Sequence, residues 1–140
     1  MKALLLAALL AAAPAEAGVF DTPELLQPQQ AFRLSARALD ARTVELAFAI
    51  ADGYYMYRDR FRFATAAGQP LTADIPRGKM KDDPVFGRTE ILRRETRIRL
   101  QVPAGATGAL ELDVTSQGCA DQGVCFLPQT QRVRVTLPSS

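Results

Sequence analysis

Two cysteines, Cys119 and Cys125, are the residues whose type and spacing are best suited to chemistry. Between them, Asp121 can cap a turn through its side chain and Gly123 can adopt a positive φ. The residues on both sides of the pair have strand character. The spacing therefore predicts that the two cysteines lie near the end of a hairpin, close enough to form a disulfide.

Two interpretations of this pair remain open on the residues alone, a structural disulfide or a thiol–disulfide exchange site. Closing a loop of about seven residues stabilises a fold by only roughly 2.4 kcal/mol, against about 4.7 kcal/mol for a loop of 100 residues. Exchange requires instead that an attacking thiolate can reach one sulfur. The spacing differs from Cys-x-x-Cys, and the acidic Asp121 is expected to raise the pKa of a nearby thiol. These features favour a pair that reacts only with a docked partner.

The absence of histidine excludes several other sites. A Ser-His-Asp triad, a Cys-His nucleophile and a histidine-ligated metal are ruled out, and two cysteines alone do not make a structural zinc site. We therefore predict no metal and no cofactor. Copper(I) binding by Met56, Met80 and the cysteines is a third interpretation, because thioether and thiolate suit that ion, but the spacing matches no motif.

The first 17 residues are predicted to be a secretory signal peptide. Lys2 supplies a positive charge, Ala3 to Ala13 form an apolar run, and Ala15-Glu16-Ala17 ends in small residues suited to cleavage before Gly18. The run is shorter than the roughly 20 residues that a membrane-spanning helix needs, which disfavours a retained anchor. One domain over residues 18–140 follows, in an oxidising compartment where a disulfide can form. The net charge of +2 indicates no nucleic-acid partner.

The dominant hydrophobic period in this domain is two, which predicts strands. Alternating segments begin at Phe32 and at Val44 and are joined by a turn at residues 40–42, so they form a hairpin. Further strand signals lie at residues 54–57, 60–65, 71–75, 98–102, 110–114 and 133–137. About eight short strands and almost no helix predict an all-β fold, an antiparallel β-sandwich.

Residues 76–90 do not follow this pattern. They contain two prolines, two glycines and the charges of Lys79, Lys81, Asp82 and Asp83. We interpret this segment as a long surface loop, and loops of this length in compact domains are usually functional or disordered. One short helix is predicted within residues 23–30.

The segment Gln117–Pro128, with its Gly-Cys-Ala-Asp-x-Gly-x-Cys string, resembles the active-site segment of a known family, the N-terminal periplasmic domain of the thiol:disulfide interchange protein DsbD. Asp52–Arg58 resembles the aromatic strand of that family, and Asp82–Gly87 followed by Glu90-Ile91 resembles its cap loop. Val19-Phe20-Asp21 also fits. The resemblance extends over residues 18–137.

This resemblance implies an immunoglobulin-like β-sandwich whose cysteines cycle between dithiol and disulfide without a cofactor. It implies a periplasmic component of a protein-disulfide reductase, or only its electron carrier. The expected donor is a thioredoxin-like domain, and the expected acceptors are periplasmic disulfide isomerases and a reductase of cytochrome c maturation. It favours Cys125 as the cysteine linked to partners and Cys119 as the resolving cysteine. Family members continue into a membrane domain and a thioredoxin-like domain, so a chain ending at Ser140 would need a donor on another chain.

The resemblance also implies which residues surround the cysteines: Tyr55, Tyr57, Asp83, Val85, Phe86 and Asp121. Val85 and Phe86 are expected to form an apolar lid that shields the sulfurs from other oxidants. The family usually has an aromatic at the place of Val85 and an acid at the place of Pro84, so the lid of this chain is expected to shield less and to be stiffer. For the two tyrosines, a place in the ordinary sandwich core is the alternative.

Overall fold

The computed structural model describes residue 13 and residues 24–139. The signal peptide predicted over residues 1–17 lies, apart from Ala13, outside the described residues. The described residues fold into short antiparallel strands with one α-helical turn and one 3-10 turn. In order these are α1 Pro28–Ala31, β1 Phe32–Ala38, β2 Thr43–Ile50, β3 Tyr54–Tyr57, η1 Arg58–Arg60, β4 Arg62–Thr65, β5 Ala73–Asp74, β6 Lys79–Asp83, β7 Gly87–Leu92, β8 Glu95–Gln101, β9 Ala109–Ser116, β10 Gly118–Ala120 and β11 Gln129–Thr136.

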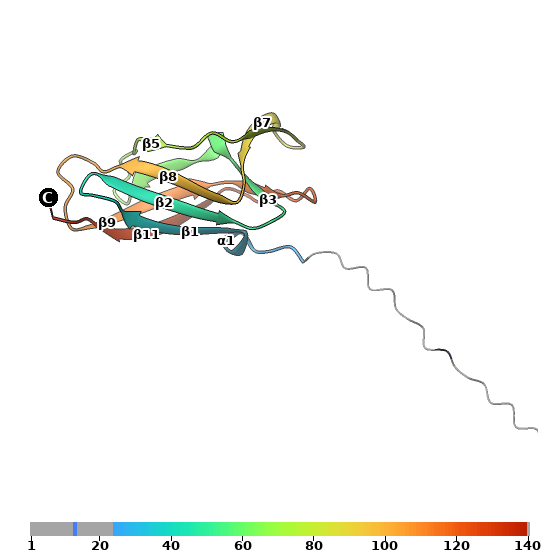
Figure 1. Ribbon diagram of the computed structural model, residues 1–140, viewed down its shortest axis with the longest axis horizontal. Coiled ribbons are helices and arrows are strands. Elements are labelled where there is room, and N and C mark those ends of the chain that lie inside the picture. The colour runs from blue at the N-terminus through green and yellow to red at the C-terminus, as the bar shows by residue number, and fades with distance from the viewer. Residues whose placement is uncertain (1–12, 14–23, 140) are drawn as a thin grey trace, which may run out of the picture.

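The strands form three sheets, with the orders β1-β2-β8-β5, β11-β9-β4 and β10-β3-β7-β6. The first two sheets make the two layers of a sandwich, while β3 and β7 of the third lie toward one end of it (Figure 1). The predicted immunoglobulin-like antiparallel sandwich is confirmed. Within the described residues, no helix has the length and apolar character needed to cross a membrane.

The core lies between the two layers and follows from the alternation in the sequence. Buried positions recur every second residue in β8, at Thr96, Ile98 and Leu100, because successive side chains of a strand point to opposite faces. The predicted hairpin is confirmed, and its register pairs Leu34 with Phe48. Each large apolar side chain buried in this way contributes roughly 1.5–3 kcal/mol.

The interpretation of residues 76–90 as one long loop is wrong. This segment forms the hairpin β6–β7, which pairs Lys79 with Ile91 and Asp83 with Gly87 and leaves a turn of three residues. The sequence signal was hidden because β6 is an edge strand, and edge strands often carry lysine and other charges in place of alternating apolar residues. Val85 and Phe86, the residues expected to form a lid, therefore lie in the turn of a hairpin and not in a long loop.

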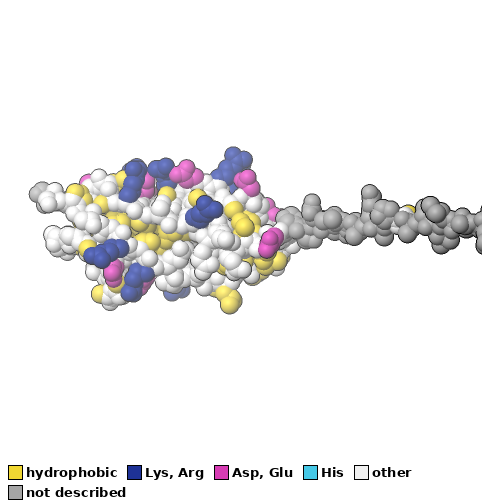
Figure 2. All heavy atoms as spheres, turned by 90° about the horizontal axis from the view of Figure 1, so that it is seen from below, with side chains coloured by type: hydrophobic (Ala, Val, Ile, Leu, Met, Phe, Trp, Pro, Cys, Tyr) yellow, Lys and Arg dark blue, Asp and Glu magenta, His cyan; other side chains and the backbone are white. Residues whose placement is uncertain are grey.

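Charged side chains are spread over the surface of the described residues. On the face shown in Figure 2, basic and acidic side chains are interspersed and do not form one basic patch. Several of them are paired, for example Arg132 with Asp113 at 2.9 Å and Arg97 with Glu95 at 2.7 Å. Such exposed pairs each contribute at most about 1 kcal/mol, so they serve solubility more than stability.

Candidate functional site

Strand β3 separates two clusters of buried side chains. Tyr54 and Met56 point into the sandwich core, whereas Tyr55 and Tyr57 point to the opposite face of the end sheet. Cys119 of β10 is paired with Tyr55 and therefore lies on the same face. We call the group formed by Tyr55, Tyr57, Ile91 and Cys119, with Phe86 and Cys125 packed against it, the redox cluster.

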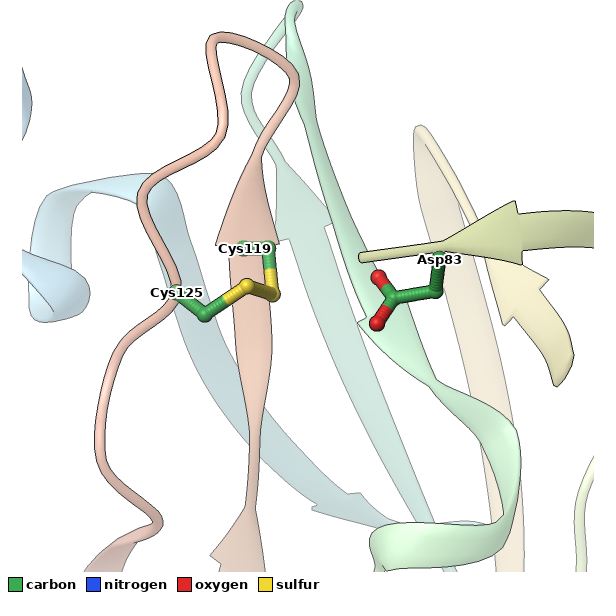
Figure 3. A group of neighbouring side chains, drawn as sticks. All are labelled: Asp83, Cys119 and Cys125. Atoms are coloured by element: carbon green, nitrogen blue, oxygen red, sulfur yellow. A yellow bond between two sulfur atoms is a disulfide. The ribbon is translucent and has the colours of Figure 1, made fainter. Parts of the chain in front are cut away.

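The redox cluster is held together by the cysteine segment and by a close-fitting glycine. Cys119 and Cys125 form a disulfide between β10 and the chain that returns beside it (Figure 3). The return is a tight turn in which Ala120 N–H donates to Val124 O at 2.7 Å and Gly123 has φ +97°, as its position predicted. A Cβ on Gly118 would lie 2.5 Å from the Tyr55 carbonyl oxygen, so the residue before Cys119 must be glycine for β10 to pair with β3.

The two sulfurs differ in their surroundings. Cys119 is completely buried, whereas Cys125 is only partly buried. The hydroxyl oxygen of Tyr57 lies 2.8 Å from the Cys119 Sγ and 3.6 Å from the Cys125 Sγ. Sulfurs in a disulfide carry no hydrogen, and the single hydroxyl hydrogen of Tyr57 is donated to Asp83 at 2.8 Å, so the disulfide is approached by the Tyr57 oxygen without a hydrogen bond of its own. One sulfur therefore lies against a hydroxyl inside the protein, and the other is nearer to solvent.

Asp83 is the acidic group that faces the disulfide. Its carboxylate points from the end of β6 toward the sulfurs, and the ligand atoms of Asp83, Cys119 and Cys125 all lie within 4.8 Å of one another (Figure 3). One carboxylate oxygen accepts hydrogen bonds from the hydroxyls of Tyr55 and Tyr57, the latter at 2.8 Å. The other accepts from the backbone N–H groups of Val85 and Phe86, at 2.8 and 2.9 Å. The same side chain thus positions both tyrosines and shapes the hairpin tip.

The protonation states in the redox cluster follow from these contacts. Burial, reinforced by the hydrogen bond to Asp83, raises the pKa of Tyr55 to about 12, and burial with the same carboxylate raises the pKa of Tyr57 further. Burial alone would raise the pKa of the Asp83 carboxyl, but the hydrogen bonds from Tyr55, Phe86, Tyr57 and Val85 outweigh it and lower that pKa. At neutral pH both tyrosines are donors and Asp83 is charged.

The pH dependence of stability should report this carboxylate. Because folding lowers the pKa of Asp83 below its ordinary value of 3.8, its contribution is fully present above that pH and is lost as the pH falls through the lower folded value. We expect the stability difference between the wild type and Asp83→Asn, measured by urea unfolding from pH 7 to pH 2, to shrink in the acid range. Other carboxylates cancel in this difference, so a constant gap would contradict the assignment.

The other predicted residues divide between the redox cluster and its border. Phe86 contacts Tyr57 edge to face, with ring centroids 4.8 Å apart, whereas Val85 is 58% exposed at the hairpin tip. Asp121 accepts two hydrogen bonds from Arg93, at 2.8 and 3.1 Å, so its charge is compensated on the turn. The carboxylate that the sulfurs face is Asp83, not Asp121.

Two functional candidates escaped the sequence prediction. Arg93 joins the cysteine turn to the end of β7 and lies 5.2 Å from the centroid of the Tyr55 ring. Arg60 lies over the ring of Phe86, 3.9 Å from its centroid. Arg93 follows Ile91 at a spacing of two, so the period of β7 would have placed it on the same face once that strand was recognised. No sequence signal indicates Arg60.

A metal centre is not favoured by the arrangement. Both oxygens of Asp83 accept two hydrogen bonds each, and the sulfurs are bonded to each other, so these donors are satisfied within the fold. The copper interpretation required Met56 and Met80 near the sulfurs. Met56 lies in the sandwich core on the other face of β3, and Met80 is 52% exposed on β6. The fold does not gather that ligand set.

The fold and the site together define a class, an immunoglobulin-like sandwich with a disulfide-bonded cysteine pair beside a tyrosine and a carboxylate on the outer face of an end sheet. Residues 22–137 match the family described as thiol:disulfide interchange protein DsbD, N-terminal. The chain belongs to this family of DsbD N-terminal domains, as its cysteine segment indicated.

Relatives and solved structures agree. DsbD of Ralstonia nicotianae is 47% identical over 117 residues, which cover 80% of this chain and 19% of the relative. DsbD 1 of Pseudomonas aeruginosa is 37% identical over 145 residues, covering 94% of this chain and 24% of the relative. The chain thus spans a quarter or less of the length of these curated relatives.

Two solved structures of proteins from Neisseria meningitidis share the fold. The reduced DsbD N-terminal domain matches with a TM-score of 0.72 and 31% identity, covering 80% of this chain and 90% of that one. The complex of the DsbD N-terminal and PilB N-terminal domains matches with a TM-score of 0.66 and 30% identity, covering 79% of this chain and 87% of that one.

Proposed function

We propose that this domain relays reducing equivalents through the Cys119/Cys125 pair to thioredoxin-fold proteins in the periplasm. It acts as the electron carrier of a protein-disulfide reductase and uses no cofactor. The donor is a thioredoxin-like domain, and the acceptors are disulfide isomerases and a reductase of cytochrome c maturation. Membership in the DsbD family supports this function, and the complex formed by the related Neisseria domain supports a protein partner. The domain assignment to residues 18–140, behind a cleaved signal peptide, is part of the proposal.

The observation that carries the proposal is the asymmetry of the two sulfurs. Exchange needs one sulfur that an incoming thiolate can reach and one that can leave as a thiolate. Cys125 is the less buried sulfur, and Cys119 is buried with the Tyr57 hydroxyl 2.8 Å away. These surroundings suit attack at Cys125 and departure of Cys119.

Reduction of the domain proceeds in two displacements. A donor thiolate attacks the Cys125 Sγ, the Cys119–Cys125 bond breaks, and its electron pair leaves on the Cys119 Sγ. The neutral Tyr57 hydroxyl turns its hydrogen toward this thiolate, while Tyr55 and two backbone N–H groups still serve Asp83. The second thiol of the donor then attacks the donor's first sulfur, which is bonded to Cys125 in the mixed disulfide, and Cys125 leaves. Two electrons and two protons thereby enter the domain.

Delivery to an acceptor runs these steps in reverse. The Cys125 thiolate attacks the acceptor disulfide, and Cys119 then attacks the Cys125 Sγ and expels the reduced acceptor. The negative charge of Asp83, within 4.8 Å of both sulfurs, disfavours the thiolate forms. The reduced pair is thereby kept as unreactive thiols until a docked partner changes its surroundings.

A purely structural disulfide in an immunoglobulin-like binding module is the alternative. A bridge over a short loop contributes only about 2–3 kcal/mol in the chain-entropy model. A structural disulfide also needs no charged or polar group beside its sulfurs, whereas here Asp83 and Tyr57 both face the disulfide. The site therefore supports exchange over a staple.

Electron transfer to a partner tests the proposal. The reduced domain is mixed with an oxidised thioredoxin-fold protein that carries a Cys-x-x-Cys site, and the thiols of each are counted by alkylation and mass spectrometry. We expect one dithiol to pass to the partner for each domain oxidised, and a Cys119→Ser, Cys125→Ser double variant serves as the control. Absence of transfer with several such partners would contradict the proposal.

A further inference from the structure

The tip of the β6–β7 hairpin contacts both the redox cluster and Arg60. The Phe86 N–H donates to the Asp83 carboxylate at 2.9 Å, and the Phe86 ring contacts Tyr57, whose hydroxyl oxygen touches both sulfurs. The guanidinium of Arg60 lies 3.9 Å from the centroid of the same ring. Phe86 is thus in contact with both a tyrosine and an arginine.

The geometry of Arg60 is that of a cation–π contact. A guanidinium within about 6 Å of a ring centroid is attracted by the negative face of the ring, and Arg forms such contacts more often than Lys. Arg60 is exposed, and among the described residues it forms no ion pair and no side-chain hydrogen bond. Its neighbour Arg58, by contrast, is fixed by Glu90 and by the carbonyls of Ile75 and Pro76. Among the described residues, the Phe86 ring is therefore the group with which the Arg60 guanidinium interacts electrostatically.

The chain path couples this contact to the chemistry. Arg60 ends η1, which directly continues β3, so the residue that holds Phe86 lies three positions after Tyr57, the residue that touches the sulfurs. The hairpin tip that bears Phe86 comes from a distant part of the sequence and is hydrogen-bonded to Asp83. If the tip lifts, Phe86 leaves Tyr57 and Arg60 together.

We propose that Arg60 is a positioning residue that holds Phe86 closed over the redox cluster and so limits the access of thiols to Cys125. The biological purpose of this role rests on the proposed exchange function, but the measurement below does not require that function. Weakening the contact increases the fraction of molecules in which the tip is lifted, and a small thiol then reaches the disulfide more often. The energy typical of an exposed cation–π contact corresponds to about a two- to fivefold change in that fraction.

The test is the rate at which a small dithiol reduces the Cys119–Cys125 disulfide. We expect Arg60→Met, which keeps the apolar stem but removes the charge, to raise this rate about two- to fivefold. Arg60→Lys retains a cation and should stay close to the wild type. Arg62→Met is the matched control, because Arg62 is exposed on β4 and makes no cation–π contact within the described residues; it should leave the rate unchanged.

A double-mutant cycle of Arg60 and Phe86 distinguishes loss of their specific contact from a general loosening of the hairpin. In a Phe86→Leu background, Arg60→Met should have no further effect, because the ring it contacts is gone. An unchanged rate in Arg60→Met, an equal increase in Arg62→Met, or the same increase with and without Phe86 would each overturn the proposal. So would a fall in the urea midpoint large enough to account for the rate through global unfolding. These rates are measured without a protein partner. Failure of the proposed electron transfer and failure of the Arg60 proposal can therefore be told apart.

Discussion

Replacing Cys119 by serine is expected to convert a transient mixed disulfide into a stable one. With Cys125 alone, the domain can still form a disulfide with an activated partner cysteine, but the buried thiol that would resolve it is missing. Replacing Cys125 by serine should instead reduce mixed-disulfide formation below detection, since Cys119 is completely buried. Incubation of each variant with a thioredoxin-fold partner bearing one activated cysteine, followed by non-reducing electrophoresis and mass spectrometry, measures both outcomes.

The two serine variants are each other's control. Both lose the same short-loop disulfide and so should lose a similar free energy of unfolding, about 2–3 kcal/mol in the chain-entropy model. A difference in adduct yield between them therefore reports the position of the sulfur and not the stability of the fold. Equal adducts from both variants, or a stable adduct formed only by Cys119, would contradict the assignment of Cys125 as the attacked residue.

Replacing Asp83 by alanine is expected to destabilise the fold strongly for a substitution of a polar residue. The change removes the acceptor of two tyrosine hydroxyls and of two backbone N–H groups at the hairpin tip. Each polar group left unsatisfied in a buried site costs about 1–3 kcal/mol, and water can reach some of these groups, so we expect a loss of about 3 kcal/mol. Urea unfolding of the oxidised domain measures this loss.

Two neighbouring substitutions sharpen that experiment. Asp83→Asn keeps one carbonyl oxygen for the N–H groups and should lose less, while the missing charge should make the reduced cysteines alkylate faster at neutral pH. Asp82 is the matched control, because it is exposed and only loosely paired with Arg88 at 3.6 Å. Asp82→Ala should change stability by about 0.5 kcal/mol or less. Similar losses for the two alanine variants would show that the buried network is not what Asp83 supports.

The sandwich and the cysteine pair were predictable because local sequence patterns indicate both of them. The alternation that starts at Phe32 and at Val44 reports one buried face, and a turn at residues 40–42 fixes the register of β1 on β2. Cys119 and Cys125 are six residues apart with Gly123 between them, which makes a tight return of the chain the simplest geometry. Both inferences need only the residues within one hairpin.

The surroundings of the cysteines were harder to predict because they depend on contacts between distant segments. The edge strand β6 has no apolar alternation, so the hairpin that brings Asp83 to the sulfurs was interpreted as a loop. The acid beside the cysteines in the sequence, Asp121, turned out to bind Arg93, and the acid that faces the sulfurs lies far away in the chain. Arg60 and Phe86 likewise meet only through the fold.

The equilibrium reduction potential of the Cys119–Cys125 couple tests the central claim most directly. Equilibration of the domain with glutathione or thioredoxin redox buffers, with the thiol and disulfide forms quantified by mass spectrometry, gives this potential. A carrier that exchanges electrons with thioredoxin-fold partners should have a potential above about −300 mV, within the range of those partners. A potential well below about −300 mV, where structural disulfides of exported proteins lie, would contradict an exchange function and identify the bridge as a staple.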